Sequence, residues 1–313
     1  MRHHLYYHMD ADGHASAGIV QEFLERTQGP QVDIQFQPVN YGMKIYTNNI
    51  RNGDDVYMVD FCLQPAAEMA EFYKFLESKK CKFTWIDHHA TILETIAEYP
   101  ELKHALGTRD TSKKAACELT WEYLYYNQDR PMPRIIKLIS DWDTFRKDNM
   151  EEWARLVVPL QAYLRHMRSD PKHNRRLWPT MLRADQEVLL LGVEETGGML
   201  AAYHQQLDDS KMRGFSRKGT FAGYKAIIVN SPQVNSTCFE RMAGHAEVDL
   251  GVSWVFTKQG QFSVSIYPVK PEIDAGVLCK KLAEEGPYKS GGGHPGAAGF
   301  QTDWEHLSRL MSF

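Results

Sequence analysis

Two short apolar runs that each end on an aspartate constrain the fold of this chain most strongly. They are Asp55–Asp60 (DVYMVD) and Lys82–Asp87 (KFTWID). Runs of this kind are typical of strands that are buried on both faces of a sheet. Stretches with helical spacing follow them, at Ala66–Leu76 and Lys114–Tyr125. The alternation predicts an α/β unit with a mostly parallel sheet and helices on both faces.

The same alternation extends toward both ends of the first half of the chain. Leu5–Tyr7 is predicted to be a strand, Ala15–Leu24 an amphipathic helix and Val32–Phe36 a further strand. Arg134–Ile139 is predicted to be a helix. Residues 1–150 therefore form the predicted α/β domain.

The remainder of the chain has a different pattern. Residues 151–215 lack strand signals and are expected to form a helical connector, with Met181–Leu207 as one long helix interrupted near Gly197 and Gly198. Residues 216–313 are expected to form a smaller α+β domain. Its predicted elements are strands at Tyr224–Val229, Leu250–Phe256, Gln261–Tyr267 and Ala297–Gln301, helices at Cys238–Gly244 and Asp274–Ala283, and a hairpin turn at Lys258–Gly260.

Composition narrows the class of protein. A chain of 313 residues with 43% hydrophobic and 24% charged residues is typical of a globular protein of two domains. A net charge of −4 argues against coating long nucleic acid, but it permits a short anionic substrate held by local cations. We expect no membrane span and no signal peptide. Five cysteines without CxxC spacing are expected to be buried, reduced thiols in a cytoplasmic protein.

Acids and imidazoles gather where the predicted strands end. His8, Asp10 and Asp12 occupy alternate positions after the first strand, so they can share one face of an extended segment. The carboxyl ends of parallel strands also form ligand clefts. Taken alone, this motif is as typical of a solvated acidic turn as of a metal site.

Three further places add candidate ligands. Asp60 ends one strand, and Asp87, His88 and His89 follow another; a run of three such groups has little packing purpose. Asp141 and Asp143 follow the helix at Arg134–Ile139, and one of the two is expected to close the site while the other caps a helix or binds Arg146. Carboxylates mixed with imidazoles suit Mn²⁺, and Mg²⁺ less well. Two such ions activate water and neutralise phosphate charge, so the pattern points to phosphate-ester hydrolysis.

Two other features offer substrate contacts. Gly291, Gly292 and Gly293 precede His294 and are expected to form an ordered loop whose backbone N–H groups approach a phosphate. Arg165–Arg183 holds six cations against one acid, with Tyr163 and Trp178 nearby, which suits a short single strand as well as an ordinary solvated surface. Arg109 precedes a predicted helix, another position from which a cation reaches phosphate.

In order and rough spacing, these motifs resemble the DHH phosphoesterase superfamily. More narrowly, they resemble the subfamily with the DHH-associated C-terminal domain, which includes nanoRNases (oligoribonuclease-like enzymes) and RecJ-type exonucleases. The closest phrases are Trp85–His89 (WIDHH) and Gly291–His294 (GGGH), and the resemblance covers nearly the whole chain. It implies a DHH catalytic domain, the connector, and a substrate-binding C-terminal domain.

The resemblance also implies roles for individual residues. His8 and Asp10 would hold one ion, Asp12 and His88 the other, and Asp60 would bridge them. An aspartate of the fourth motif, Asp141 or Asp143, would join the second ion. Asp87 and His89 would act catalytically, on the phosphate or by supporting the ligands, and His294 with its glycines would bind substrate. Two Mn²⁺ ions are expected, with Mg²⁺ or Co²⁺ as substitutes.

The leading functional hypothesis is a Mn²⁺-dependent nanoRNase-like phosphodiesterase. It would hydrolyse short oligonucleotides or dinucleotides to mononucleotides by a water activated between two metals. One alternative is a phosphodiesterase for a cyclic dinucleotide or its linear product. An alternative of another class is a nucleotide-binding protein without catalysis on the same fold. A homodimer is one option for its assembly, and Asp60→Ala is expected to abolish hydrolysis and leave the fold intact.

Overall fold

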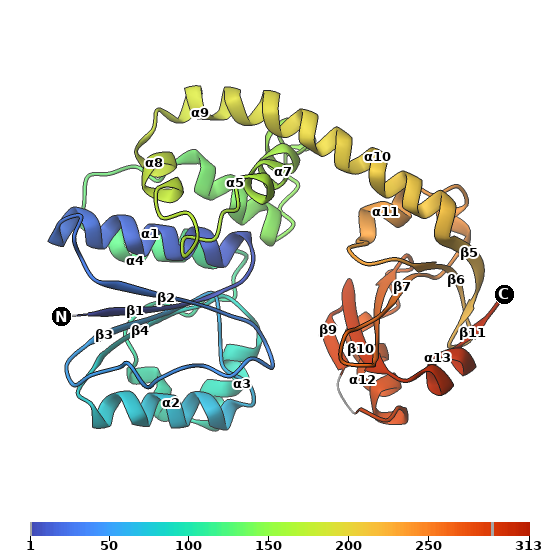
Figure 1. The fold of residues 1–313 in the computed structure, drawn as a ribbon, viewed down its shortest axis with the longest axis horizontal. Coiled ribbons are helices and arrows are strands. Elements are labelled where there is room, and N and C mark those ends of the chain that lie inside the picture. The colour runs from blue at the N-terminus through green and yellow to red at the C-terminus, as the bar shows by residue number, and fades with distance from the viewer. Residues whose placement is uncertain (1, 289–290) are drawn as a thin grey trace. The chain divides into compact units, whose positions relative to one another are not determined.

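The computed structural model describes residues 2–288 and 291–313 (Figure 1). They divide into two compact units, Met1–Ala201 and Ala202–Phe313, each with its own hydrophobic core. No helix in the described part of the chain is long and apolar enough to cross a membrane.

The first unit is built on a parallel sheet. Its strands are β1 (His3–His8), β2 (Ile34–Val39), β3 (Asp55–Val59) and β4 (Lys82–Ile86), in the order β2-β1-β3-β4. All neighbours pair in parallel, so the carboxyl ends of the strands meet at one edge. The strands predicted from the sequence are confirmed, and the acids that follow them share that edge.

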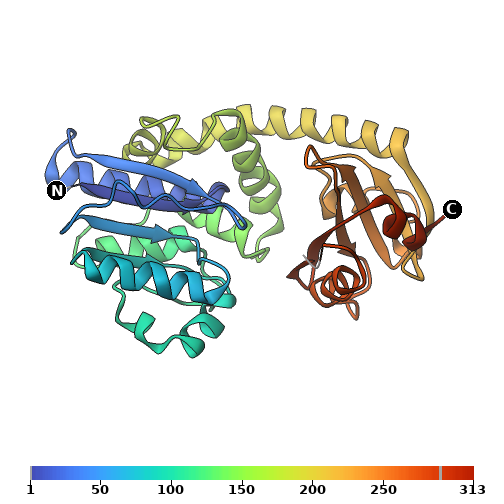
Figure 2. The same cartoon turned by 60° about the horizontal axis from the view of Figure 1, so that its bottom comes forward.

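Helices cover both faces of this sheet, as predicted (Figures 1 and 2). α1 (Ala11–Gln28) and α4 (Ala116–Tyr125) lie on one face, and α2 (Ala66–Ser78) and α3 (Thr91–Glu98) on the other. Successive side chains of β1 alternate between the two cores: Leu5 and Tyr7 pack with α1 and α4, while Tyr6 packs with α2 and α3. Burial on both faces explains why the strands are apolar without a polar alternation.

A second layer of helices completes the first unit. It consists of α5 (Arg134–Asp143), α6 (Met150–Glu152), a π-helical turn (Trp153–Val157), α7 (Val158–His166), α8 (Leu177–Arg183), α9 (Gln186–Gly192), a second π-helical turn (Val193–Gly197) and the start of α10 (Gly198–Phe215). A 3₁₀ turn (Pro100–His104) packs instead with α2 and α3, where Leu102 joins their buried cluster.

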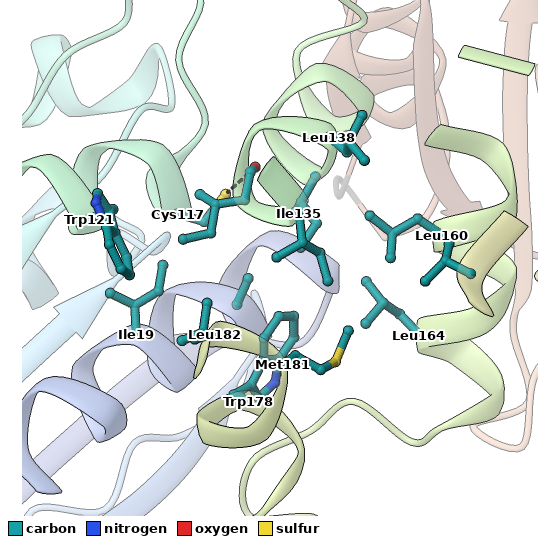
Figure 3. Close-up of a cluster of buried hydrophobic side chains, with 14 of the residues drawn as sticks. Ile19, Cys117, Trp121, Ile135, Leu138, Leu160, Leu164, Trp178, Met181 and Leu182 are labelled. Atoms are coloured by element: carbon teal, nitrogen blue, oxygen red, sulfur yellow. Dashed lines mark hydrogen bonds between the residues drawn. The ribbon is translucent and has the colours of Figure 1, made fainter. Parts of the chain in front are cut away.

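Most of the segment 151–215, expected to be a connector, packs within the first unit. Leu160 and Leu164 of α7 and Trp178 of α8 share a buried cluster with Ile19 of α1 and Ile135 of α5 (Figure 3). Only α10 continues into the second unit. The helices of residues 151–197 therefore form part of the structure that supports the sheet edge.

The prediction of a single helix over Met181–Leu207 is wrong at the N-terminal end of that range. α8 ends at Arg183, and Asp185 caps a new helix by accepting hydrogen bonds from the backbone N–H groups of Glu187 and Val188. An aspartate in this position stabilises a helix start and not a helix interior. Near Gly197, where an interruption was expected, the chain makes a π-helical turn and then continues as α10.

Close packing between α1 and α8 provides a stability prediction. A Cβ atom on Gly18 would lie 2.2 Å from Cγ of Trp178, which is fully buried. We expect Gly18→Ala to destabilise the protein by about 2 kcal/mol and to lower its melting temperature by about 5 °C, because the tryptophan cannot move without breaking the cluster. Gly192→Ala is the matched control, since its Cβ would meet nothing within 4 Å. It should be neutral or slightly stabilising. Equal melting temperatures for the two variants would show that α8 does not pack on α1.

The second unit is a mixed sheet with helices. Its strands are β5 (Ser216–Phe221), β6 (Tyr224–Asn230), β7 (Leu250–Phe256), β8 (Phe262–Pro268), β9 (Gly291–His294), β10 (Ala297–Thr302) and β11 (Met311–Ser312), in the order β11-β5-β6-β7-β8-β10-β9. Its helices are α11 (Ser236–Glu240), a 3₁₀ turn (His245–Glu247), α12 (Ala275–Glu285) and α13 (Trp304–Leu310). The α+β prediction is confirmed for this unit.

Details of the second unit differ from the prediction. The hairpin turn at Lys258–Gly260 is present, with the Gly260 N–H donating to the Thr257 carbonyl at 3.0 Å. β5 was not predicted, because SRKGTF has little apolar character. α11 begins and ends earlier than Cys238–Gly244, since Asn235 caps its first turn.

Candidate metal centre

The predicted ligands come together at the carboxyl edge of the parallel sheet. His8 is the last residue of β1, Asp60 follows β3, and Asp87, His88 and His89 follow β4. Asp10 caps α1, with Oδ1 accepting from the Gly13 N–H at 2.9 Å, and Asp12 lies in the first turn of that helix. Asp143 is the last residue of α5.

Three overlapping groups of ligand atoms result. Each consists of three side chains whose donor atoms all lie within 4.8 Å of one another: His8, Asp10 and Asp60; Asp12, His88 and Asp143; Asp60, His88 and His89. Asp60 faces both sides, because Oδ2 lies 3.7 Å from His8 Nδ1 and Oδ1 lies 3.4 Å from His88 Nε2. A carboxylate between two such groups is suited to bridge two cations.

The environment of Asp60 indicates that it needs a cation. Its side chain is 1% exposed, and among the described residues neither carboxylate oxygen accepts a hydrogen bond. Burial, and then the negative charges of Asp12 and Asp10, raise its pKa well above the usual range. Its backbone also has a φ of 57°, in the left-handed region that aspartate tolerates at some cost. A buried carboxylate that accepts no hydrogen bond is strongly unfavourable, so a bound cation would stabilise this side chain.

The neighbouring groups show the same accumulation of charge. Burial, and then the charge of Asp12, raise the pKa of Asp143 to about 7. Burial acts to lower the pKa of His8, but the carboxylates of Asp10 and Asp60 outweigh it and raise that pKa to about 10. His8 Nδ1 lies 2.6 Å from Asp10 Oδ2. Without metal, bound protons therefore neutralise part of the negative charge that a cation would otherwise neutralise.

Asp12 is held by the beginning of α4. Its Oδ2 and Oδ1 accept hydrogen bonds from the backbone N–H groups of Ala116 and Cys117 at 2.8 and 2.7 Å. Oδ2 also lies 3.6 Å from His88 Nε2. A helix N-terminus stabilises a carboxylate, so these two hydrogen bonds hold the Asp12 side chain in place beside His88.

Asp87 organises the turn that carries both histidines. Its Oδ1 accepts from the backbone N–H groups of His88 and His89 at 2.7 and 3.2 Å and lies 2.8 Å from His89 Nδ1. Burial acts to lower the pKa of His89, but this contact with Asp87 raises it overall. Asp87 itself is fully buried, so in this structure it positions the ring of His89. Catalytic roles for the two residues remain predictions.

Geometry separates the two aspartates that the sequence left open. Asp143 Oδ2 lies 3.2 Å from His88 Nε2, whereas Asp141 Oδ1 accepts a hydrogen bond from Arg146 Nε at 2.7 Å. Both lie on α5, and two positions along a helix differ by roughly 200° around its axis, so they face opposite sides. Of the two predicted ligands, only Asp143 belongs to the group around Asp12 and His88.

This difference can be tested with a pair of variants. We expect Asp143→Asn to lower Mn²⁺-dependent hydrolysis of thymidine 5′-monophosphate p-nitrophenyl ester by about a hundredfold, because it removes a charged ligand. Asp141→Asn loses only one partner of Arg146, so we expect a rate within about threefold of the parent and a stability loss below about 1 kcal/mol. The reverse order of effects would assign the ligand to Asp141.

The predicted substrate residues lie outside these ligand groups. Nη1 of Arg109 donates to the carbonyls of Trp85 and Leu106 at 3.1 and 3.0 Å, and the guanidinium lies 5.5 Å from the Trp85 ring centroid. Its contact with substrate remains a prediction. His294 belongs to the second unit, and its predicted role is likewise untested.

The glycines before His294 form a strand and not the expected loop. Gly291, Gly292 and Gly293 lie in β9, which pairs antiparallel with β10. Close packing gives a reason for two of them: a Cβ on Gly291 would lie 2.6 Å from the Cys279 carbonyl oxygen, and one on Gly293 2.7 Å from Cα of Ala298. Phosphate binding by these glycines stays a prediction.

A cavity of about 430 Å³ adjoins the ligands. Asp10, Asp12 and Asp143 form part of its wall, and the remaining lining includes His14, Trp142, Gln161, Arg165 and Ser169. Sequence reasoning singled out Arg165 as part of a cationic segment but missed Gln161 and Ser169. No local signal marks them, because more than 140 positions of chain separate them from the first metal motif.

Comparison with known proteins gives matches at the level of structure. No family model matches the chain, and no curated protein does. The DHH domain of a member of a ribosomal protein family has a TM-score of 0.61 at 13% identity, over 99% of this chain and 84% of that one. The pGpG-specific phosphodiesterase PggH from Vibrio cholerae has a TM-score of 0.53 at 13% identity, over 99% and 96%.

A third match is RecJ from Thermus thermophilus in complex with Mn²⁺. Its TM-score is 0.54 at 15% identity, over 99% of this chain, which spans only 50% of that RecJ chain. The two-unit architecture and the carboxyl-edge cluster agree with the motifs in the sequence. The chain therefore has the fold of the DHH superfamily.

Proposed function

We propose that this chain is a Mn²⁺-dependent phosphodiesterase that hydrolyses short oligonucleotides or dinucleotides to mononucleotides. The observation that carries the proposal is the buried carboxylate of Asp60, which accepts no hydrogen bond among the described residues and lies between two groups of carboxylate and imidazole ligands. Such a donor set suits Mn²⁺, and a pair of ions of this kind is typical of phosphodiester hydrolysis.

Each of these residues would have a separate role in the reaction. His8 and Asp10 would hold one ion, Asp12, His88 and Asp143 the other, and Asp60 would contact both. When bound, the ions supply an activated water and neutralise the charge that develops on the phosphate oxygens. His89, held through Nδ1 by Asp87, would present Nε2 to a phosphate oxygen. No side chain need attack the phosphorus.

The net charge of the chain and its structural matches support a short substrate. The chain carries a net charge of −4, so it lacks the broad positive field of proteins that track long strands. PggH, which matches along 96% of its own length, is specific for the dinucleotide pGpG. RecJ from Thermus thermophilus extends well beyond the match, whereas a second RecJ, an exonuclease, matches along 88% of its length. A dinucleotide-sized substrate, including the linear product of a cyclic dinucleotide, is the narrower form of the proposal.

A location in a reducing cytoplasm is also part of the proposal. All five cysteines are free thiols, and Cys62, Cys117, Cys238 and Cys279 are buried. Buried unpaired thiols are ordinary in a reducing compartment.

A substrate panel tests the proposal. The Mn²⁺-loaded protein is incubated with labelled dinucleotides, five-residue oligomers, long single strands and cyclic dinucleotides. We expect dinucleotides and pentamers to be hydrolysed far faster than long strands. Rates on long strands equal to those on dinucleotides would refute the preference for short substrates. No hydrolysis of any substrate would favour a nucleotide-binding protein without catalysis.

A further inference from the structure

The cavity beside the metal centre has the size of a ligand pocket. Its volume of about 430 Å³ lies within the ~300–1,000 Å³ that is usual for small-molecule sites. Because Asp10, Asp12 and Asp143 form part of its wall, a group attached to a phosphate at the centre would enter this cavity. This step rests on the proposed function.

Gln161 provides an unused hydrogen-bond donor in the wall. It lies on α7, and its Nε2 atom is buried without a hydrogen-bond partner among the described residues. A buried amide donor normally has a partner, since leaving it unpaired is unfavourable. A ligand with a carbonyl oxygen or a ring nitrogen would satisfy it.

Trp142 provides a flat aromatic surface in the same wall. Its ring stacks on Trp153 at a centroid distance of 5.5 Å and an interplanar angle of 14°, so its orientation is fixed. The side chain is only half-buried and lines the cavity. Stacking on an aromatic ring is the usual way in which proteins bind nucleobases without selecting a particular base.

Arg165 brings a cation to this cavity. It is exposed and makes no ion pair with any described residue, although other arginines of the segment 165–183 are engaged. Arg175 donates to the Ile34 carbonyl and lies over the Phe36 ring, and Arg183 pairs with Glu22. Arg165 therefore remains available to pair with a phosphate group.

The wall is held in place from the sheet side. His14 Nδ1 lies 3.0 Å from Ser169 Oγ, and the Tyr7 hydroxyl donates to Asp170 Oδ1 at 2.5 Å. These contacts tie the loop after α7 to β1 and α1. The pocket is thus largely formed before a ligand binds.

A larger cavity in the same unit is less suited to a nucleotide. It measures about 690 Å³ and is lined by apolar side chains of α2 such as Phe72, together with Glu68 and Glu71. These carboxylates belong to none of the candidate metal-ligand groups, so no bound cation would offset their repulsion of phosphate. None of the lining residues has a buried side-chain donor without a partner in the described structure.

We propose that the cavity of about 430 Å³ is a nucleobase pocket, in which Trp142 stacks on the base, Gln161 donates to its edge, and Arg165 binds phosphate. Gln161 is then a residue that determines preference for nucleotides over other phosphate esters. The pocket receives the nucleoside attached to the phosphate that meets the metal ligands.

Binding measurements test the pocket separately from catalysis. Uridine 5′-monophosphate, ribose 5-phosphate and inorganic phosphate are titrated calorimetrically into the Mn²⁺-loaded protein. We expect Gln161→Leu to weaken binding of the nucleotide about tenfold and binding of ribose 5-phosphate by less than about twofold. Arg165→Ala should weaken all three ligands about fivefold. Arg155→Ala, which removes an exposed arginine that pairs with Glu194, should change none of them.

Two results would contradict the proposal that this cavity binds a nucleobase. One is nucleotide binding by Gln161→Leu that equals that of the parent, and the other is an equal loss for the nucleotide and for ribose 5-phosphate. Gln161→Met is measured alongside, so that a folding defect of one variant does not decide the outcome. Hydrolysis of the p-nitrophenyl reporter is followed in parallel. If nucleotide binding depends on Gln161 but no hydrolysis occurs, the proposed phosphodiesterase function is refuted and the proposed nucleobase pocket is supported.

Discussion

Replacing Asp60 by asparagine is expected to have two opposite effects. Mn²⁺-dependent hydrolysis should fall about a thousandfold or more, because the ligand shared by the two groups is lost. The metal-free protein, however, should become more stable, with a melting temperature about 5 °C higher, because a buried carboxyl group whose oxygens accept no hydrogen bond is replaced by a neutral amide. Asparagine is the appropriate substitution, since it tolerates the φ of 57° that alanine disfavours.

Asp54→Asn is the matched control at the opposite end of β3. Asp54 is also buried, but its carboxylate accepts hydrogen bonds from the backbone N–H groups of Arg2 and Arg51 and lies 3.1 Å from His4 Nε2. This change should destabilise the protein and leave Mn²⁺-dependent turnover intact. Loss of stability in metal-free Asp60→Asn, comparable to that in Asp54→Asn, would mean that Asp60 is a satisfied structural acid.

The second large effect expected is a pH-dependent response to metal. Asp143 has a folded pKa of about 7, above the ~3.9 of an unfolded aspartate, so the folded state binds its proton more tightly. The stability that this proton provides is complete below pH ~4 and is lost as the pH rises through 7. His8, raised to about 10 from ~6.5, changes stability in the same direction between those values. Metal-free protein should therefore be less stable at pH 8 than at pH 5.

Mn²⁺ should reverse this trend. At a free concentration of 100 times its dissociation constant, one ion stabilises the folded state by about 2.7 kcal/mol, or about 5–10 °C. Protons compete for the same ligands, so the Mn²⁺-induced rise in melting temperature should be large at pH 8 and small at pH 5. Thermal scans with chelator and with Mn²⁺ measure both quantities. Asp143→Asn should reduce the pH dependence of the metal-free protein; an unchanged dependence would contradict the assignment of the coupled acid.

The metal ligands were largely predictable from the sequence, because each lies next to a strong local signal. Val56–Val59 and Phe83–Ile86 are apolar enough to identify buried strands, and the polar groups after them can only lie at the sheet edge. Asp141 and Asp143 were not separable in this way. The sequence indicated a helix that ended at Ile139, whereas α5 continues through Asp143 and turns the two carboxylates to opposite sides.

The support around the centre was not predictable from local patterns. An apolar helix face indicates burial but not its partner, so the packing of Trp178 on Gly18 gave no signal in either segment. The cavity wall has the same origin, since Gln161 and Ser169 reach the centre only through tertiary packing. Glycines before His294 were misinterpreted as a loop, because close contact with α12 and β10 favours glycine as strongly as a turn does.

The most direct test of the metal centre is anomalous diffraction from a crystal soaked in Mn²⁺. We predict two peaks, both in contact with the Asp60 carboxylate, one also contacting His8 and Asp10 and the other His88, Asp12 and Asp143. A crystal soaked in saturating Mn²⁺ that shows no manganese at these side chains would contradict the two-metal account. So would a single ion that does not contact Asp60.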